Sequence, residues 1–144
     1  MKTFKSFILT SLFALYGCSD QQNANTNEIP NLENKWTLIK TTGTIAGITH
    51  EFSTGTIIWV FKPNNTVQIT NNNTNPNLQS GFPSGIYSYS VSENPAVASC
   101  PENITIQVSE YGCLSMYDNK MYIIETFADG ITYHFELLTP TTTN

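Results

Sequence analysis

From Trp36 onward, apolar and polar residues alternate with a period of two, and β-branched and aromatic residues are frequent. Because successive residues of a strand point to opposite faces, this alternation predicts strands that bury one face. No stretch carries a convincing apolar stripe with the 3.6-residue period of a helix. We therefore predict an all-β domain, with strands at about 36–41, 45–52, 56–62, 66–70, 85–91, 104–108, 114–117, 120–127 and 131–138.

Turn signals separate these strands. The segment Lys62-Pro63-Asn64-Asn65 predicts a hairpin, because proline presets φ and asparagine tolerates the left-handed region. Asp129-Gly130 is a strong hairpin signal between the last two strands. Residues 71–83 contain five asparagines and two prolines, a composition that predicts a surface loop.

Short connections between eight or nine strands favour an antiparallel meander. Such a sheet loses its free edges when it closes, so we predict an eight-stranded β-barrel, with a β-sandwich as the alternative. The domain spans residues 34–138, and we expect the tail at 139–144 to fray because it has no apolar partners.

The N-terminus has the pattern of a secretory signal. Lys2 and Lys5 precede ten mainly apolar residues at 7–16, which are too few for a spanning helix. The segment Leu15-Tyr16-Gly17-Cys18 resembles the lipobox of bacterial lipoproteins. The resemblance implies cleavage after Gly17 and acylation of Cys18, for example with palmitate.

The lipobox resemblance also implies a location. We expect a protein anchored in the cell envelope of a Gram-negative bacterium, at the outer membrane, with the periplasmic and surface sides both open. Residues 18–33 are polar and predict a flexible tether between the lipid and the domain.

The charge balance excludes nucleic acid as a partner. The formal net charge is −5, and there is no arginine. Without residues 1–17, four lysines face eleven acids, which gives −7. Phosphate backbones require a basic surface. An acidic domain is also repelled by anionic head groups, so we expect the lipid to be the only membrane contact.

Two cysteines remain, Cys100 and Cys113, thirteen positions apart. Thiols of exported proteins are normally oxidised, so we predict a Cys100–Cys113 disulfide. A metal-binding or redox pair is the alternative, although neither cysteine lies in a CxxC motif and no histidine is near in the sequence.

Four segments together resemble the lipocalin-like domains of bacterial lipoproteins. They are Trp36 on the first strand and the stretches 58–67, 84–87 and 129–135. The likeness covers residues 34–138 and implies a barrel of the calycin type, in which a small molecule can bind.

Candidate catalytic and metal-ligating residues are few. His50 lies beside Glu51, and we expect His134 to share the solvent face with Glu136, so a metal site would need these strands to be neighbours. No serine lies in a GxSxG motif. Glu125 shares a predicted face with the lining and is therefore either inside the barrel or at its rim. We predict a protein that is not an enzyme and holds no metal or cofactor.

Aromatic residues are the candidate ligand contacts. An eight-stranded barrel can hold one small ligand or be filled by its own side chains. Our leading hypothesis is a monomer that binds a small apolar or amphipathic molecule. A packed barrel that contacts a protein or glycan through loops 71–83 or 100–113 is the rival, and a hydrolase using Glu125 or His50 is a third hypothesis. The candidate contacts are Trp59, Phe61, Tyr87, Tyr89, Tyr122 and Tyr133.

Overall fold

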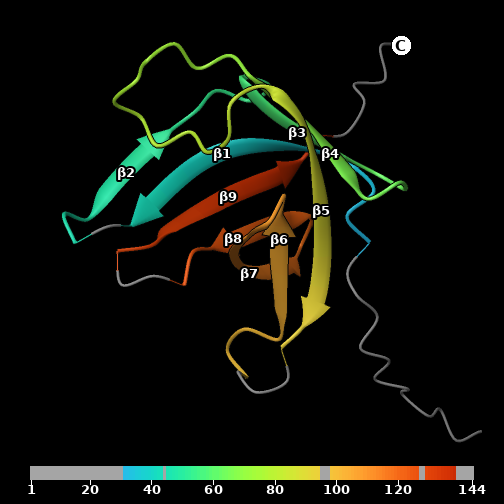
Figure 1. Ribbon diagram of the computed structural model, residues 1–144. Coiled ribbons are helices and arrows are strands. Elements are labelled where there is room, and N and C mark those ends of the chain that lie inside the picture. The colour runs from blue at the N-terminus through green and yellow to red at the C-terminus, as the bar shows by residue number, and fades with distance from the viewer. Residues whose placement is uncertain (1–30, 44, 95–97, 127–128, 139–144) are drawn as a thin grey trace, which may run out of the picture.

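The computed structural model describes residues 31–43, 45–94, 98–126 and 129–138, and within them every regular element is a strand (Figure 1). The predicted signal peptide, Cys18, residues 18–30 of the tether and the tail at 139–144 lie outside the described residues. No helix in the described part is long and apolar enough to cross a membrane. The strands are β1 (Lys35–Gly43), β2 (Ile48–Glu51), β3 (Ile57–Lys62), β4 (Thr66–Asn71), β5 (Gly85–Glu93), β6 (Glu102–Ile106), β7 (Ser109–Tyr117), β8 (Lys120–Ile124) and β9 (Ile131–Leu137).

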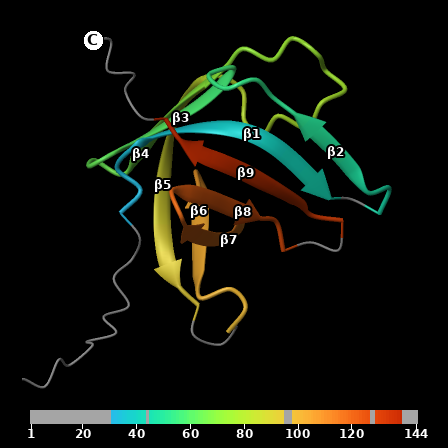
Figure 2. The same cartoon turned by 180° about the vertical axis from the view of Figure 1, so that it is seen from behind.

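Eight strands form an antiparallel meander that closes into a barrel. The order is β1-β3-β4-β5-β6-β7-β8-β9, and β9 returns to pair with β1. This closing ladder runs from Trp36 opposite Leu137 to Gly43 opposite Ile131, and Figure 2 shows the two strands side by side. The predicted all-β, eight-stranded barrel is confirmed, and the closure favours it over the sandwich.

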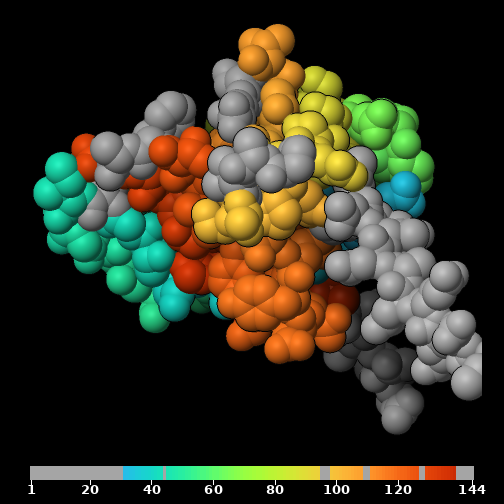
Figure 3. Space-filling model, turned by 90° about the horizontal axis from the view of Figure 1, so that it is seen from below, coloured from blue at the N-terminus to red at the C-terminus, as the bar shows by residue number. Residues whose placement is uncertain are grey.

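The ninth strand, β2, lies outside the barrel. The first part of β1 pairs with β3, whereas its last part pairs with β2, from Lys40 opposite Glu51 to Gly43 opposite Ile48. In Figure 3 this teal β1–β2 hairpin stands at the left edge, away from the orange strands β7 and β8. We predicted a strand over 45–52. The observed β2 is shorter, and it pairs with the last part of β1 as an additional edge strand.

Alternation along the strands sets the core. Strands β3, β8 and β9 bury every second residue and leave the residues between them partly or fully accessible. On β9, for example, Tyr133 and Phe135 are buried, while His134 lies on the outer face. Burying these aromatic and aliphatic side chains supplies the main stabilisation of the barrel. The core side chains come from all the barrel strands except β5, whose Tyr87, Tyr89 and Val91 pack against them.

The β3–β4 turn follows the predicted chemistry, with Asn65 at φ +57°. β8 pairs antiparallel with β9 as predicted, but their connection spans residues 125–130, and Gly130 lacks the positive φ of a two-residue Asp-Gly turn. Between β6 and β7, however, the chain turns at Gln107, with φ +59°, and Val108, which is 97% exposed. We predicted a strand through Val108; the strand ends at Ile106, and β7 begins at Ser109. Likewise β8 ends at Ile124, which places Glu125 beyond the strand.

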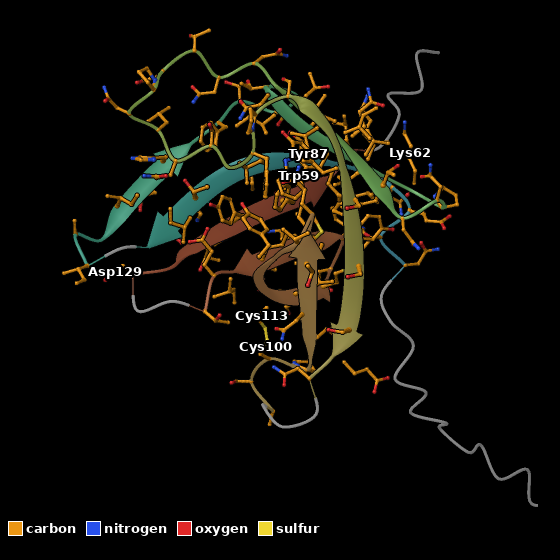
Figure 4. The ribbon with its side chains drawn as sticks, viewed as in Figure 1. Trp59, Lys62, Tyr87, Cys100, Cys113 and Asp129 are labelled. Carbon is orange, nitrogen blue, oxygen red and sulfur yellow. A yellow bond between two sulfur atoms is a disulfide. The ribbon has the colours of Figure 1, made fainter. Side chains whose placement is uncertain are left out.

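The disulfide joins a connection to the outside of the barrel. Cys100 and Cys113 are bonded, with their Cα atoms 5.4 Å apart, and both side chains are buried. Cys113 lies on β7, opposite Asn103 of β6, so the bond holds the connection that precedes β6 against β7. The predicted disulfide is confirmed, and Figure 4 shows the pair at the lower edge of the molecule.

We expect reduction of this disulfide to lower the free energy of unfolding by about 3 kcal/mol, because the bond restricts the unfolded chain over a loop of this length. Urea unfolding with and without dithiothreitol measures the change. The double variant Cys100→Ser/Cys113→Ser is the control, since its stability should not respond to the reductant. Equal stability of the oxidised and reduced wild-type protein would contradict the prediction.

Candidate functional site

The middle of the barrel is filled by side chains centred on Trp59. This residue of β3 is fully buried, and its ring centroid lies 5.0 Å from that of Phe135 and 6.1 Å from that of Phe61. Leu38, Ile57, Leu114 and Ile123 are fully buried as well. Side chains therefore occupy this level of the barrel, and the three hollows considered below lie toward its ends, as far as the described residues show.

The six predicted contacts occupy three different environments. Trp59, Phe61 and Tyr133 are buried in the core, and Tyr87 and Tyr89 are partly buried against it. Tyr122 lies on the outer face between the buried Met121 and Ile123, where its ring stacks on Tyr117 at 4.8 Å. The structure thus brings Trp59 and Tyr133 to one cluster and leaves Tyr122 outside the barrel.

We call the barrel end at which β1 finishes and β9 begins the mouth. The connection 72–84 and the connection 125–130 both lie there, because β4 and β8 end and β5 and β9 begin at this end. In Figure 4, Asp129 marks the mouth at the left, and Lys62 marks the opposite end of the barrel at the right.

A cavity of about 360 Å³ opens at the mouth. One wall is the connection 72–84, and the other consists of two tyrosines of β7 and β9. We call it the mouth pocket; its lining is Leu78, Gln79, Ser80, Gly81, Phe82, Pro83, Tyr111 and Tyr133. The loop backbone lies close over the tyrosines, because a Cβ added at Gly81 would lie 3.4 Å from the Tyr111 hydroxyl and 3.4 Å from the Tyr133 ring.

A β-bulge directs Tyr111 into this pocket. The ladder between β6 and β7 places Gly112 opposite Ile104 and Glu110 opposite Thr105, so Tyr111 is the extra residue. Bulges bend a strand and re-aim a side chain, often beside a functional site. Gly112 is required at this point, since a Cβ there would lie 2.4 Å from the carbonyl oxygen of Ile124.

The polar atoms around the pocket are incompletely satisfied. Within the described residues, the Tyr111 hydroxyl, the Trp59 indole nitrogen and the Thr41 hydroxyl are buried and have no hydrogen-bond partner. The ring centroid of Tyr111 lies 6.0 Å from that of Trp59 and 5.2 Å from that of Tyr133. Thr41 is opposite Tyr133 in the β1–β9 ladder. Most buried polar groups in proteins are paired, so the unpaired Tyr111 hydroxyl, which belongs to a residue of the pocket lining, indicates a place suited to a polar group of a ligand.

Glu125 lies at the rim and holds Tyr133. Its carboxylate accepts a hydrogen bond of 2.9 Å from the Tyr133 hydroxyl and one of 3.1 Å from the Ile131 amide. Of the two predicted positions for Glu125, the rim is therefore the one observed. Burial raises the pKa of Tyr133, and the carboxylate of Glu125 raises it further. Burial also raises the pKa of Tyr111 well above its ordinary value, so both phenols are neutral near pH 7.

Hydrogen bonds fix the loop that roofs the pocket. The side-chain Nδ2 of Asn71 donates hydrogen bonds to the backbone carbonyl oxygens of Ser80 and Phe82, at 3.2 and 3.0 Å. The Tyr87 hydroxyl donates to the Pro83 carbonyl at 2.9 Å. On the extra strand β2, Nδ1 of His50 accepts a hydrogen bond of 2.9 Å from the backbone N–H of Gln79. The roof is thus tied to β4, β5 and β2.

The pocket includes two aromatic residues that sequence reasoning missed, Tyr111 and Phe82. Phe82 comes from the loop, with its ring centroid 4.9 Å from that of Tyr111 and 6.1 Å from that of Trp59. Its place depends on distant hydrogen bonds, which no local pattern reveals. A signal did exist for Tyr111, because an isolated glycine in a strand pattern, here Gly112, indicates a bulge.

Two further hollows are present in the described part of the chain. One of about 350 Å³ adjoins the mouth pocket along the Asn-rich part of the loop, from Asn71 to Ser84, and shares Leu78, Ser80, Gly81 and Pro83 with it. Another of about 260 Å³ lies at the opposite end, next to Trp36 and the Asp118–Asn119 turn. In the described residues, no group of three or more His, Cys, Asp or Glu is placed to hold a metal ion.

His134 faces away from the pocket. Its Nε2 lies 2.9 Å from the Thr42 hydroxyl oxygen on the outer wall. Burial, together with the ammonium groups of Lys40 and Lys120, lowers the pKa of His134. The folded state therefore disfavours the protonated imidazole.

We expect this shift to make stability depend on pH. The stabilising contribution of neutral His134 is fully present above the unfolded pKa of about 6.5, and it is lost as the pH falls through the lower folded pKa. Between about pH 7.5 and about pH 5.5, the wild type should lose more free energy of unfolding than His134→Gln does. Urea unfolding at both pH values measures the difference. An equal loss in the two proteins would show that His134 is not the group responsible.

Comparisons with protein-family models, with curated protein sequences and with solved structures each returned no match.

Proposed function

We propose that this protein is a non-catalytic, lipid-anchored protein of the cell envelope that binds a small amphipathic molecule at the mouth of its barrel. The observation that carries the proposal is the mouth pocket, where Tyr111 offers a buried hydroxyl without a partner. Binding sites for small molecules are concave and mainly apolar, with a few polar groups that orient the ligand. The mouth pocket is concave and combines three aromatic rings with polar groups of the loop, and Tyr111 adds an unpaired hydroxyl that could orient a ligand.

The packed middle of the barrel changes where the ligand would bind. We expect it between the roof loop and the tyrosines of β7 and β9, with only one end of the molecule enclosed. A volume of about 360 Å³ suits a small ring or a short chain. Trp59 then packs against the Tyr111 ring from the core and does not itself line the pocket.

Native mass spectrometry of the processed protein, purified gently from the envelope of its own host, tests this function. The part of the chain from Ser19 onward contains all strands of the barrel. We expect a stoichiometric non-covalent adduct that disappears on denaturation. Tyr111→Ala should lose the adduct, whereas Tyr117→Ala, a matched change at the far end of the same strand, should keep it. A bare polypeptide for the wild type would argue against a carried ligand.

The packed core also favours a second candidate, an interaction module that uses its loops. In the 72–84 connection, the side-chain oxygen of Asn73 accepts a hydrogen bond from the backbone N–H of Asn75, and that of Asn75 accepts one from the backbone N–H of Asn77. These bonds give the exposed loop a defined shape. Under this function, changes in the loop such as Asn75→Ala would abolish capture of a protein or glycan, while Tyr111→Ala would not.

A further inference from the structure

We propose that the mouth pocket selects ligands that carry a positive charge, specifically an amine or quaternary ammonium group on an apolar body. This inference rests on the proposed function and specifies the chemistry of its ligand. The first argument is the distribution of charge. Glu125 and Asp129 lie at the mouth, and the connection 72–84 contains no charged residue.

No lysine of the described residues lines the pocket. Lys35, Lys62 and Lys120 lie at strand ends on the opposite side of the barrel, as Lys62 shows in Figure 4. Lys40 lies in the middle of β1, opposite Glu51 on one side and His134 on the other. An anionic ligand would therefore enter a region of negative potential and find no cation among the lining residues.

The Tyr133 hydroxyl is arranged to accept a hydrogen bond from a ligand. Tyr133 uses its only hydroxyl proton to donate to Glu125 at 2.9 Å, so the oxygen can offer only lone pairs to a ligand. The carboxylate also makes this oxygen more electron-rich, because hydrogen bonds in a chain polarise one another. The unpaired Tyr111 oxygen lies on the same wall. An ammonium group, which only donates, matches the Tyr133 oxygen, and the Tyr111 hydroxyl can accept from it as well.

Aromatic faces surround the same space. Tyr111 contacts Tyr133 at 5.2 Å and Phe82 at 4.9 Å between ring centroids, and all three line the pocket. Aromatic faces attract cations, and cages of such rings are a recurring solution for quaternary ammonium groups. The rings also provide the apolar contact that the body of the ligand needs.

The competing chemistry is a neutral ligand with a hydrogen-bond acceptor. The Trp59 indole N–H has no partner in the described residues and would suit such a group. Trp59, however, is fully buried and does not line the pocket, whereas both tyrosine oxygens are on its wall. The Tyr133 oxygen, whose proton is already donated to Glu125, and the acidic residues at the mouth therefore favour the cation.

Three probes with the same ring separate these possibilities. The chain from Ser19 onward is titrated by calorimetry with phenethylamine, phenethyl alcohol and phenylacetate near neutral pH. We expect the amine to bind about three- to thirtyfold more tightly than the alcohol, as a cation over aromatic rings should. Phenylacetate should bind most weakly. Alcohol binding equal to or tighter than amine binding would overturn the charge selectivity and leave the pocket as a ligand site. If none of the three binds, the proposed function itself fails.

Matched variants locate the charge. Glu125→Gln should bring the ratio of amine affinity to alcohol affinity close to one, and alcohol binding that is still measurable reports that the pocket is intact. Glu136→Gln is the control, because it removes the same charge from the outer wall, where Glu136 pairs with Lys120. Tyr111→Phe should weaken amine binding through loss of one acceptor. Equal amine preference in Glu125→Gln and the wild type would refute the role of Glu125.

Discussion

Trp59→Ala is expected to reduce the free energy of unfolding by about 3 to 5 kcal/mol, the cost of removing a large buried aromatic side chain. Trp59 is fully buried and contacts four rings: that of Phe61 on its own strand and those of Phe82, Tyr111 and Phe135 from three other parts of the chain. Alanine would leave a cavity in the middle of the barrel that these rings can fill only partly. Urea unfolding followed by circular dichroism measures the loss.

Two further variants keep this test informative. Trp59→Phe should cost clearly less than alanine, because it retains a ring and because the indole nitrogen has no hydrogen-bond partner in the described residues to lose. Ile86→Ala is the control, since Ile86 is 66% exposed and its loss should change stability by no more than about 0.5 kcal/mol. A Trp59→Ala effect as small as that of Ile86→Ala would show that Trp59 is not the centre of the core.

Local chemistry explains why most of the barrel is predictable. The alternation of apolar residues along β3 and β9 is enough to assign Trp59, Phe61, Tyr133 and Phe135 to the inner face. Asn64-Asn65 and Asp129-Gly130 mark connections between strands that pair with each other. In a meander, strands that are neighbours in sequence are also paired in space, so few pairings between distant segments have to be predicted. The pairing of β9 with β1, which closes the barrel, is the main one.

The errors in strand limits have local causes. The β6–β7 turn places Gln107 at positive φ without the Asn-Gly or Asp-Gly signal that normally marks such a turn. Val108 has the composition of a strand residue, although it lies at the exposed tip. Such a turn is specified by the pairing of Ile106 with Ser109 and not by its own residues.

The site was harder to predict than the fold because two of its aromatic residues depend on tertiary structure. Tyr111 faces the pocket only because β7 carries an extra residue against β6, and that bulge requires Gly112 to pass close to Ile124. Phe82 reaches the pocket only because Asn71 and Tyr87 hold the loop that carries it. Neither arrangement has a periodic signature, whereas Tyr133 follows the alternation of its strand.

The fold separates the proposed anchor from the proposed pocket. β1 begins at Lys35, at the end of the barrel opposite the mouth, and Leu32 just before it is buried in the core. The indole nitrogen of Trp36 donates to the Leu32 carbonyl at 3.3 Å, which fixes where the chain enters the domain. A lipid attached before this point would hold the protein by the far end and leave the mouth accessible to ligands.

Cys18→Ser should move the protein from the membrane fraction to the soluble fraction of its host and abolish labelling by an alkyne analogue of palmitate. Each buried methylene contributes about 0.8 kcal/mol to membrane binding, so two or more chains hold a protein where one holds it only reversibly. The domain is acidic and would be repelled by anionic head groups, so loss of the lipid should leave no second means of attachment. The double variant Cys100→Ser/Cys113→Ser is the matched control: it removes the other two cysteines and should retain both the label and the membrane location. Label that persists in Cys18→Ser would place the lipid elsewhere, and a wild-type protein recovered unlabelled in the soluble fraction would rule out the lipid anchor.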